Sequence, residues 1–217
     1  MIFALMTIGA LAVLVAWRLV AAGRASVWVA MGCVEGAAGV ATLAARRASL
    51  SPEVPPVWAA VAGIGAGLAL YLATAAFVVI VRRWQVFDRH VAEIYDQRKG
   101  LSWPVALLLA AGVTAPAEEL FWRGLVQGRL AEAIGWPLAA LATWGIYVAV
   151  NAASESLPIV AGAIVSGAVW GALALWTHGV LASLLCHAVW TALMLSFPPG
   201  GDRGRARPRR DAAAPVQ

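Results

Sequence analysis

Three ionisable residues stand close together in an otherwise apolar stretch, at a spacing that could support catalysis. Glu118, Glu119 and Arg123 lie in the segment Ala-Pro-Ala-Glu-Glu-Leu-Phe-Trp-Arg-Gly. Residues four apart are neighbours on an α-helix, whereas adjacent residues point in different directions. Glu119 can therefore pair with Arg123, and Glu118 is left without a partner on its own helix.

The unpaired carboxylate is the better candidate for chemistry. A carboxylate in apolar surroundings holds a proton more readily than one in water. Such a group can take a proton from water and return it to a leaving group. We predict that Glu118 is the general acid/base and that Glu119 and Arg123 form a structural clamp. The alternative is a buried ion pair with a spare glutamate near the membrane interface.

Two further pairs of polar residues share helix faces downstream. Tyr147 and Asn151 are four residues apart, and so are His187 and Thr191. An isolated histidine is more often a satisfied core residue than a catalyst, and an isolated asparagine more often joins helices. The pattern therefore indicates catalysis only if Glu118, His187 and Asn151 converge.

Three other intramembrane protease designs lack their residues. A zinc protease needs the pattern HExxH, and none of the three histidines begins it. A serine design needs a Gly-x-Ser-x-Gly-like turn, and Ser166 has no glycine two residues before it. An aspartyl protease needs two aspartates in the membrane, but the aspartates lie outside the apolar runs, at Asp88, Asp96, Asp202 and Asp211. The remaining possibility is a protease that uses glutamate and histidine for catalysis.

The composition is that of a membrane protein. Of 217 residues, 62% are hydrophobic and 12% are charged, and the mean hydropathy is +0.80. A soluble domain is nearer half apolar and a quarter charged, so that class is excluded, together with disordered and fibrous chains. A transmembrane β-barrel would alternate in polarity over segments of about ten residues. The unbroken apolar runs favour an all-α, polytopic helical bundle.

About seven apolar runs are long enough to cross a bilayer, which takes about 20 residues. They are residues 1–20, 27–45, 57–81, 103–130, 136–152, 158–177 and 180–197. The first run has no basic start, so we expect a retained helix rather than a cleaved signal peptide. Pro116 in the fourth run should kink or restart the helix. Gly63 and Gly67, like Gly167 and Gly171, are four apart and permit close helix contact.

Polar segments divide the chain. Residues 82–100 place apolar side chains at helical spacing among charges, which predicts an amphipathic helix at the interface, with a solvated connector as the alternative. We expect N-terminal helices over residues 1–101, a catalytic core over 102–197 and a basic, disordered tail over 198–217. The arginines of the tail favour a cytoplasmic C-terminus. The net charge of +5 fits such topology signals better than nucleic-acid binding.

The motif residues resemble those of a known family. The run from Glu118 to Arg123 is similar to the EExxxR motif of the CAAX protease and bacteriocin-processing family. That family includes type II CAAX prenyl endopeptidases and bacterial Abi-type intramembrane proteases. Its second motif, FxxxH, corresponds to residues 147–151, and its third, His-xxx-Asn or His-xxx-Asp, to residues 187–191. The resemblance covers about residues 102–197.

The resemblance implies proteolysis of a peptide bond within or beside the bilayer. Glu118 then activates the water, Glu119 and Arg123 support it, and His187 stabilises the oxyanion. Asn151 stands where the family usually has histidine, and Thr191 where it has Asn or Asp. An asparagine amide can still donate to an oxyanion or orient water, and a threonine offers one hydroxyl. The alternative is a weakened or inactive member that acts as a membrane binding or regulatory protein.

Several further expectations concern cofactors, partners and location. We predict no cofactor and no tightly bound zinc, since the core offers only Glu118, Glu119 and His187 as good ligands. The expected partners are membrane lipids and a peptide or membrane-protein substrate that enters laterally, without nucleic acid. The excess of arginine over lysine suggests a bacterial plasma membrane. The substrate and the oligomeric state are left open.

Four other polar or reactive residues lie outside the three motifs. His178 is expected in a turn rather than in the site, and Cys33 and Cys186 indicate no disulfide because both lie in apolar runs. Whether Glu35 joins the site is left open. A transporter that uses Glu35 and Glu118 is disfavoured, because the chain shows no inverted repeat.

Overall fold

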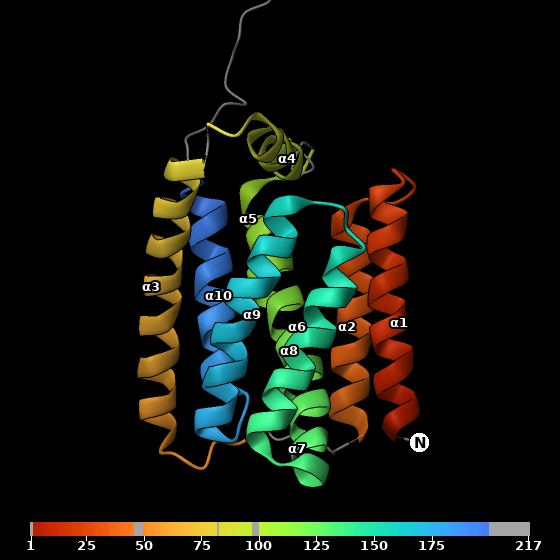
Figure 1. Cartoon of the computed structure of the whole chain (residues 1–217), viewed down its shortest axis with the longest axis vertical. Helices are drawn as coiled ribbons and strands as arrows, with labels where there is room; N and C mark the ends of the chain where they lie inside the picture. Colours follow the sequence, from red (N-terminus) through yellow and green to blue (C-terminus); the bar gives the residue numbers. More distant parts are fainter. Residues whose placement is uncertain (1, 46–49, 82, 97–99, 200–217) are drawn as a thin grey trace, which may run out of the picture.

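The regular structure of the chain is helical. The computed structural model describes residues 2–45, 50–81, 83–96 and 100–199, and no β-strand occurs in these ranges. Figure 1 shows helices that stand alongside one another as a bundle, with one short helix across an end. Seven of the helices are α1 (Ile2–Ala21), α2 (Val27–Ala45), α3 (Pro56–Val81), α4 (Gln85–Asp96), α8 (Trp136–Ala152), α9 (Leu157–Thr177) and α10 (Leu181–Ser196). The predicted all-α class is confirmed.

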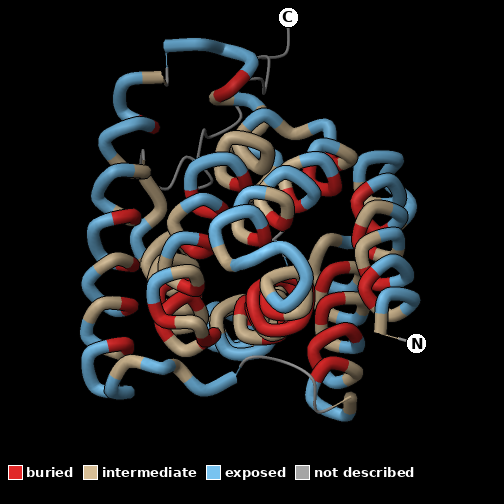
Figure 2. The backbone as a smooth tube through the Cα atoms, turned by 60° about the horizontal axis from the view of Figure 1, so that its bottom comes forward, coloured by how far each residue is buried: buried red, intermediate tan, exposed pale blue. Residues whose placement is uncertain are grey.

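The bundle belongs in a membrane. Within the described residues, five helices are long and apolar enough to span one: α1, α2, α3, α9 and the continuous helix Trp103–Ile134. Their outward faces carry large apolar side chains, such as Val40 at 67% and Ile80 at 73% exposure. Figure 2 shows buried residues concentrated on the inward sides of the helices. The chain is an integral membrane protein, while the expected total of seven spans would also require the shorter α8 and α10.

The continuous helix Trp103–Ile134 has an irregular winding. It consists of α5 (Trp103–Leu107), η1 (Leu108–Thr114), α6 (Ala115–Glu119), η2 (Leu120–Gln127) and α7 (Gly128–Ile134), where η1 and η2 are π-helical. In η1 the backbone reaches five residues back, and the N–H of Ala115 accordingly donates to the carbonyl of Ala110. The expected restart at Pro116 is therefore not observed. Wider turns make room for the proline ring, which would clash with a carbonyl four residues earlier in a regular α-helix.

Proline and glycine set the ends of the last helices. Pro137 and Pro158 lie in the first turns of α8 and α9, where a missing N–H costs no hydrogen bond. Gly135 separates α7 from α8 with a φ of 79°, a conformation that favours glycine. His178 ends α9 in the left-handed region, with a φ of 51°.

Small residues bring the N-terminal helices against the central ones. A Cβ atom on Gly63 would lie 2.4 Å from the carbonyl oxygen of Ala182, and one on Gly67 would lie 2.8 Å from that of Cys186. The predicted close contact at this glycine pair is thus confirmed, and it joins α3 to α10. Helix α2 packs against α6, η1 and η2. These contacts fix the surroundings of the residues at the junction of α6 and η2.

Helix α4 lies across one end of the bundle (Figure 1). Its Phe87 is buried and meets Phe77 edge to face, with ring centroids 5.6 Å apart. The Nδ1 atom of His90 accepts a hydrogen bond from the backbone N–H of Leu157. The predicted amphipathic helix thus forms within residues 82–100, although residues 82 and 97–99 lie outside the described part. The expected basic tail also lies outside it from residue 200 onward.

Candidate active site

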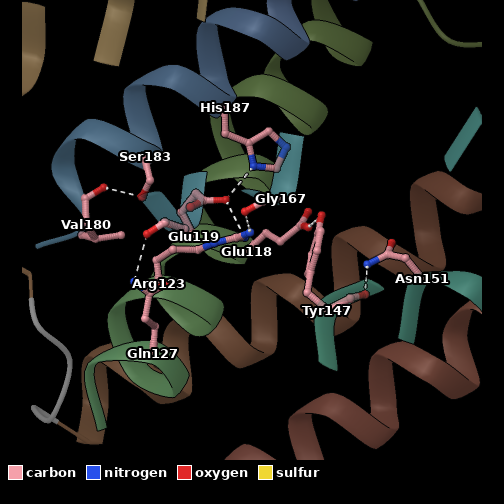
Figure 3. A network of polar contacts seen from close by, with 11 residues as sticks. Glu118, Glu119, Arg123, Gln127, Tyr147, Asn151, Gly167, Val180, Ser183 and His187 are labelled. Carbon is pink, nitrogen blue, oxygen red and sulfur yellow. Dashed lines mark hydrogen bonds and ion pairs between the residues drawn. The ribbon is translucent and has the colours of Figure 1, made fainter. Parts of the chain in front are cut away.

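A buried carboxylate organises the centre of the bundle (Figure 3). Glu119 is fully buried at the end of α6. Its Oε1 atom accepts a hydrogen bond from Nη1 of Arg123 at 3.0 Å, and Nδ1 of His187 lies 3.0 Å from the same oxygen. The helical spacing predicted the first contact, and α10 contributes the second.

Arg123 joins three elements of the bundle. Besides its ion pair, its Nη2 atom donates to the carbonyl oxygen of Gly167 on α9 at 3.1 Å. Its guanidinium carbon lies 4.7 Å from the ring centroid of Tyr147 and 5.3 Å from that of Trp170. Cations are attracted to aromatic faces at such distances. The expected clamp therefore extends beyond its own helix to α8 and α9.

The orientation of His187 is fixed on two sides. Its ring stacks on Trp170, with centroids 3.7 Å apart and an interplanar angle of 18°. A carboxylate that is paired with Arg123 only accepts hydrogen bonds, so Nδ1 of His187 carries the hydrogen that faces Glu119. The remaining ring nitrogen, Nε2, is then a proton acceptor in neutral imidazole and a donor in imidazolium.

The neighbouring Glu118 has different surroundings. It is half-buried, whereas Glu119 is fully buried. Its Oε1 atom accepts a hydrogen bond from the hydroxyl of Tyr147, at 2.5 Å. Figure 3 shows Tyr147 reaching Glu118 from the neighbouring helix α8. The two adjacent carboxylates therefore have different partners. Glu119 is held by Arg123 and His187, and Glu118 by the phenol of Tyr147.

Asn151 and Thr191 stand apart from this network. The Asn151 amide is buried, but its Nδ2 donates to the backbone carbonyl of Tyr147, one turn earlier on the same helix, at 2.9 Å. Thr191 is half-buried on α10, one turn beyond His187. Their predicted contributions to water or oxyanion binding stay predictions. His178 lies at the end of α9, where its ring stacks on Trp136 and Nδ1 is 2.7 Å from Oε2 of Glu53.

Comparison with known proteins finds a family that is similar to the segment containing this network. Residues 100–193 match the family model described as type II CAAX prenyl endopeptidase Rce1-like. Over this segment the chain is similar to the CAAX protease family. The match confirms the resemblance seen in the sequence, and the family name implies a hydrolase that cleaves peptide bonds. Neither the curated proteins nor the solved structures contain a match to the chain.

The CAAX-protease segment contains contributors that the motif analysis did not select. Tyr147 contacts Glu118, Trp170 supports both Arg123 and His187, and Gln127 donates from Nε2 to the carbonyl of Gly171 at 3.0 Å. The sequence pattern places Tyr147 on one helix face with Asn151 and at the first position of the second motif, but it does not predict the contact with Glu118. Gln127 lies four residues after Arg123, so helical spacing could have placed it on the same face.

The described side chains of the site do not form the donor set of a metal ion. A catalytic zinc usually takes three protein ligands and keeps one open position. Among the described residues, no group of three or more His, Cys, Asp or Glu side chains is placed to hold a metal. Oε1 of Glu119 already serves Arg123 and His187. We therefore route no step through a metal, and the predicted lack of tightly bound zinc stays a prediction.

A substitution on α9 tests the placement of Tyr147. A Cβ atom on Gly167 would lie 2.9 Å from Cδ1 of Tyr147, which forces the phenol ring to move. Gly167→Ala should lower peptide cleavage about tenfold or more, since small displacements of catalytic groups are costly. The measurement is the cleavage rate in detergent. Gly162→Ala on the same helix is the control, because nothing lies within 4 Å of its added Cβ. Equal rates for the two variants would show that the position of Tyr147 is unimportant.

Proposed function

We propose that the protein is an intramembrane endopeptidase that activates water with Glu118. One observation carries this proposal: two adjacent carboxylates occupy opposite environments. Glu119 is fully buried and pairs with Arg123 and His187, while Glu118 is half-buried and accepts a hydrogen bond from the Tyr147 hydroxyl. Pairs of carboxyl groups in contrasting surroundings commonly divide structural and acid/base roles.

The proposed reaction uses these groups in sequence. Glu118 takes a proton from water as the oxygen forms a bond to the peptide carbonyl carbon. The negative charge that develops on the carbonyl oxygen is stabilised by Nε2–H of protonated His187, whose Nδ1–H is held by Glu119. Glu118 then delivers the proton to the leaving amine as the C–N bond breaks. The products are an amine and a carboxylic acid, which loses its remaining proton to the amine or to water, and Glu118 is ionised again.

The hydrogen bonds within the network suit this scheme. Tyr147 stabilises the charged form of Glu118 and fixes its direction. The arrangement of Glu119 and His187 resembles the general use of a carboxylate to orient a catalytic imidazole. Because Arg123 neutralises Glu119, the carboxylate needs no proton of its own and stays available to His187.

A second function is favoured by the variant motif positions. Asn151 donates to its own helix, and Thr191 lies outside the Glu119 network. A family member that has lost catalysis and serves as a membrane binding or regulatory protein would tolerate both features. Under that alternative, biological activity would not depend on Glu118.

The deciding experiment is a cleavage screen in detergent or proteoliposomes. Wild type is incubated with a broad pool of peptides and membrane proteins, and new termini are identified by mass spectrometry. A double variant, Asn151→His/Thr191→Asn, restores the usual family residues and runs in parallel. Cleavage by wild type supports the endopeptidase. Cleavage by the double variant alone would favour the non-catalytic alternative.

Chelators should leave the cleavage rate unchanged. The scheme uses only protein side chains, so treatment with a strong zinc chelator should keep the rate within about twofold of the untreated enzyme. The rate is measured before and after chelation and dialysis. A loss of cleavage that added zinc restores would contradict this expectation and call for a metal-based scheme.

The cellular setting is part of the proposal. We place the protein in a bacterial plasma membrane, with the basic C-terminal tail on the cytoplasmic side. The substrate would be a peptide or membrane protein that enters laterally between helices. A prenyl group is not required, because the proposed chemistry acts on the peptide bond alone.

A further inference from the structure

Helix α2 brings a third carboxyl group to the site. Glu35 is only 1% exposed, although it lies outside the segment that matches the CAAX protease family. Helix α2 packs against both α6 and η2. The approach is close at Gly39, one turn after Glu35, where an added Cβ would lie 2.8 Å from the Cβ of Ala117. The sequence left open whether Glu35 joins the site, and in the structure it lies on a helix that packs against the site.

Within the described part of the chain, Glu35 has no hydrogen-bond partner. Both of its carboxyl oxygens are buried and unpaired among the described residues. The indole of Trp122 is close to it, but Nε1 does not reach hydrogen-bond geometry and is itself unpaired. Such an orphaned group is unusual, because buried polar atoms are nearly always hydrogen-bonded.

The charged groups around Glu35 belong to the candidate active site. Glu118, Glu119 and Arg123 are the charged groups that act on it electrostatically. The single cation among these three is already paired with Glu119. Glu35 and Glu118 are therefore two neighbouring carboxyl groups without a cation of their own.

The surroundings decide which of the two carries the negative charge. An ionised carboxylate without donors or a cation is strongly disfavoured in an apolar interior. Glu35 is in that situation, whereas Glu118 is half-buried and accepts a hydrogen bond from Tyr147. The same contrast separates acid from base in other carboxyl pairs.

We infer that Glu35 is a positioning residue that keeps its proton, so that the negative charge of the Glu35–Glu118 pair resides on Glu118. This rests on the proposed function, in which Glu118 must be charged to take a proton from water. The functional unit then includes α2 as well as the CAAX-protease segment. Glu35 does not touch the substrate in this scheme and acts through Glu118.

Infrared difference spectroscopy at neutral pH tests the location of the proton. Spectra of wild type, Glu35→Gln and Glu118→Gln are recorded in the same detergent. Wild type minus Glu35→Gln should contain the C=O stretch of a protonated carboxylic acid. Wild type minus Glu118→Gln should contain carboxylate bands instead. Glu132→Gln is the control, since exposed Glu132 pairs with Arg129 and should also contribute carboxylate bands.

Each reversal of this pattern would overturn the inference. Carboxylate bands lost in Glu35→Gln, or a protonated band lost in Glu118→Gln, would place the charge on Glu35. If Glu35→Gln does not fold, the Glu118→Gln spectrum still decides, because it must lose carboxylate and keep every protonated band. The spectra need no substrate. Failure of wild type to cleave anything would therefore count against the proposed function alone.

Discussion

Replacing Glu118 by glutamine should reduce peptide cleavage at least about a hundredfold, the usual loss when a general acid/base is removed. Glutamine has nearly the same shape and can still accept the hydrogen bond from Tyr147, but it cannot take a proton from water. The measurement is the rate of appearance of the product termini found in the cleavage screen. The folded state of the variant is checked by its thermal unfolding midpoint in detergent.

The control for this variant is Glu132→Gln, farther along the same continuous helix. Glu132 is 58% exposed and pairs with Arg129, so its loss should change neither cleavage nor stability noticeably. A folded Glu118→Gln protein that cleaves as fast as wild type would contradict the assignment of the base. It would also favour the non-catalytic alternative if a biological activity persisted.

Local helix geometry predicted the part of the site that lies on one helix. The i, i+4 spacing paired Glu119 with Arg123 and left Glu118 without a helical partner, and the ion pair is present at 3.0 Å. Such neighbours follow from the backbone path alone, so a single sequence suffices to find them. The same spacing places Gly63 and Gly67 on one face of α3, although it does not indicate that this face meets α10.

Contacts between helices could not be predicted in this way. Tyr147 reaches Glu118 across a separation of 29 residues, and His187 reaches Glu119 across 68. Glu35 approaches the site only because α2 packs against α6 and η2. Helical spacing shows which residues share a face, but it does not show which other helix that face meets.

Two local features also departed from simple helical expectations. Pro116 predicted a kink or a new start, yet the helix continues through it with π-helical turns on both sides. The regular α-helical period of 3.6 residues does not indicate where π-helical turns occur. An isolated asparagine more often joins helices, but the buried Asn151 amide bonds the carbonyl four residues earlier on its own helix. Short polar side chains often make such local bonds in preference to distant ones.

Replacing Arg123 by methionine should cost about 3–5 kcal/mol of stability, the usual effect of removing one partner from a buried ion pair. Glu119 is fully buried and would lose its ion pair with Arg123. The hydrogen bond to Gly167 and the contacts with Tyr147 and Trp170 would be lost as well. The expected result is a clear drop in the thermal unfolding midpoint and in the yield of monodisperse protein in detergent.

Two companion variants separate the charge of Arg123 from its shape. Arg123→Lys keeps the charge but lacks the planar fork that reaches Glu119 and Gly167 together, so it should recover only part of the stability. Glu119→Gln/Arg123→Met removes both charges and should be more stable than Arg123→Met alone, because no buried charge is left unpaired. A double variant no more stable than the single one would show that Arg123 acts through packing. In that case the ion pair would not help to hold α9 against the site. The different roles of the two glutamates would then need another physical explanation.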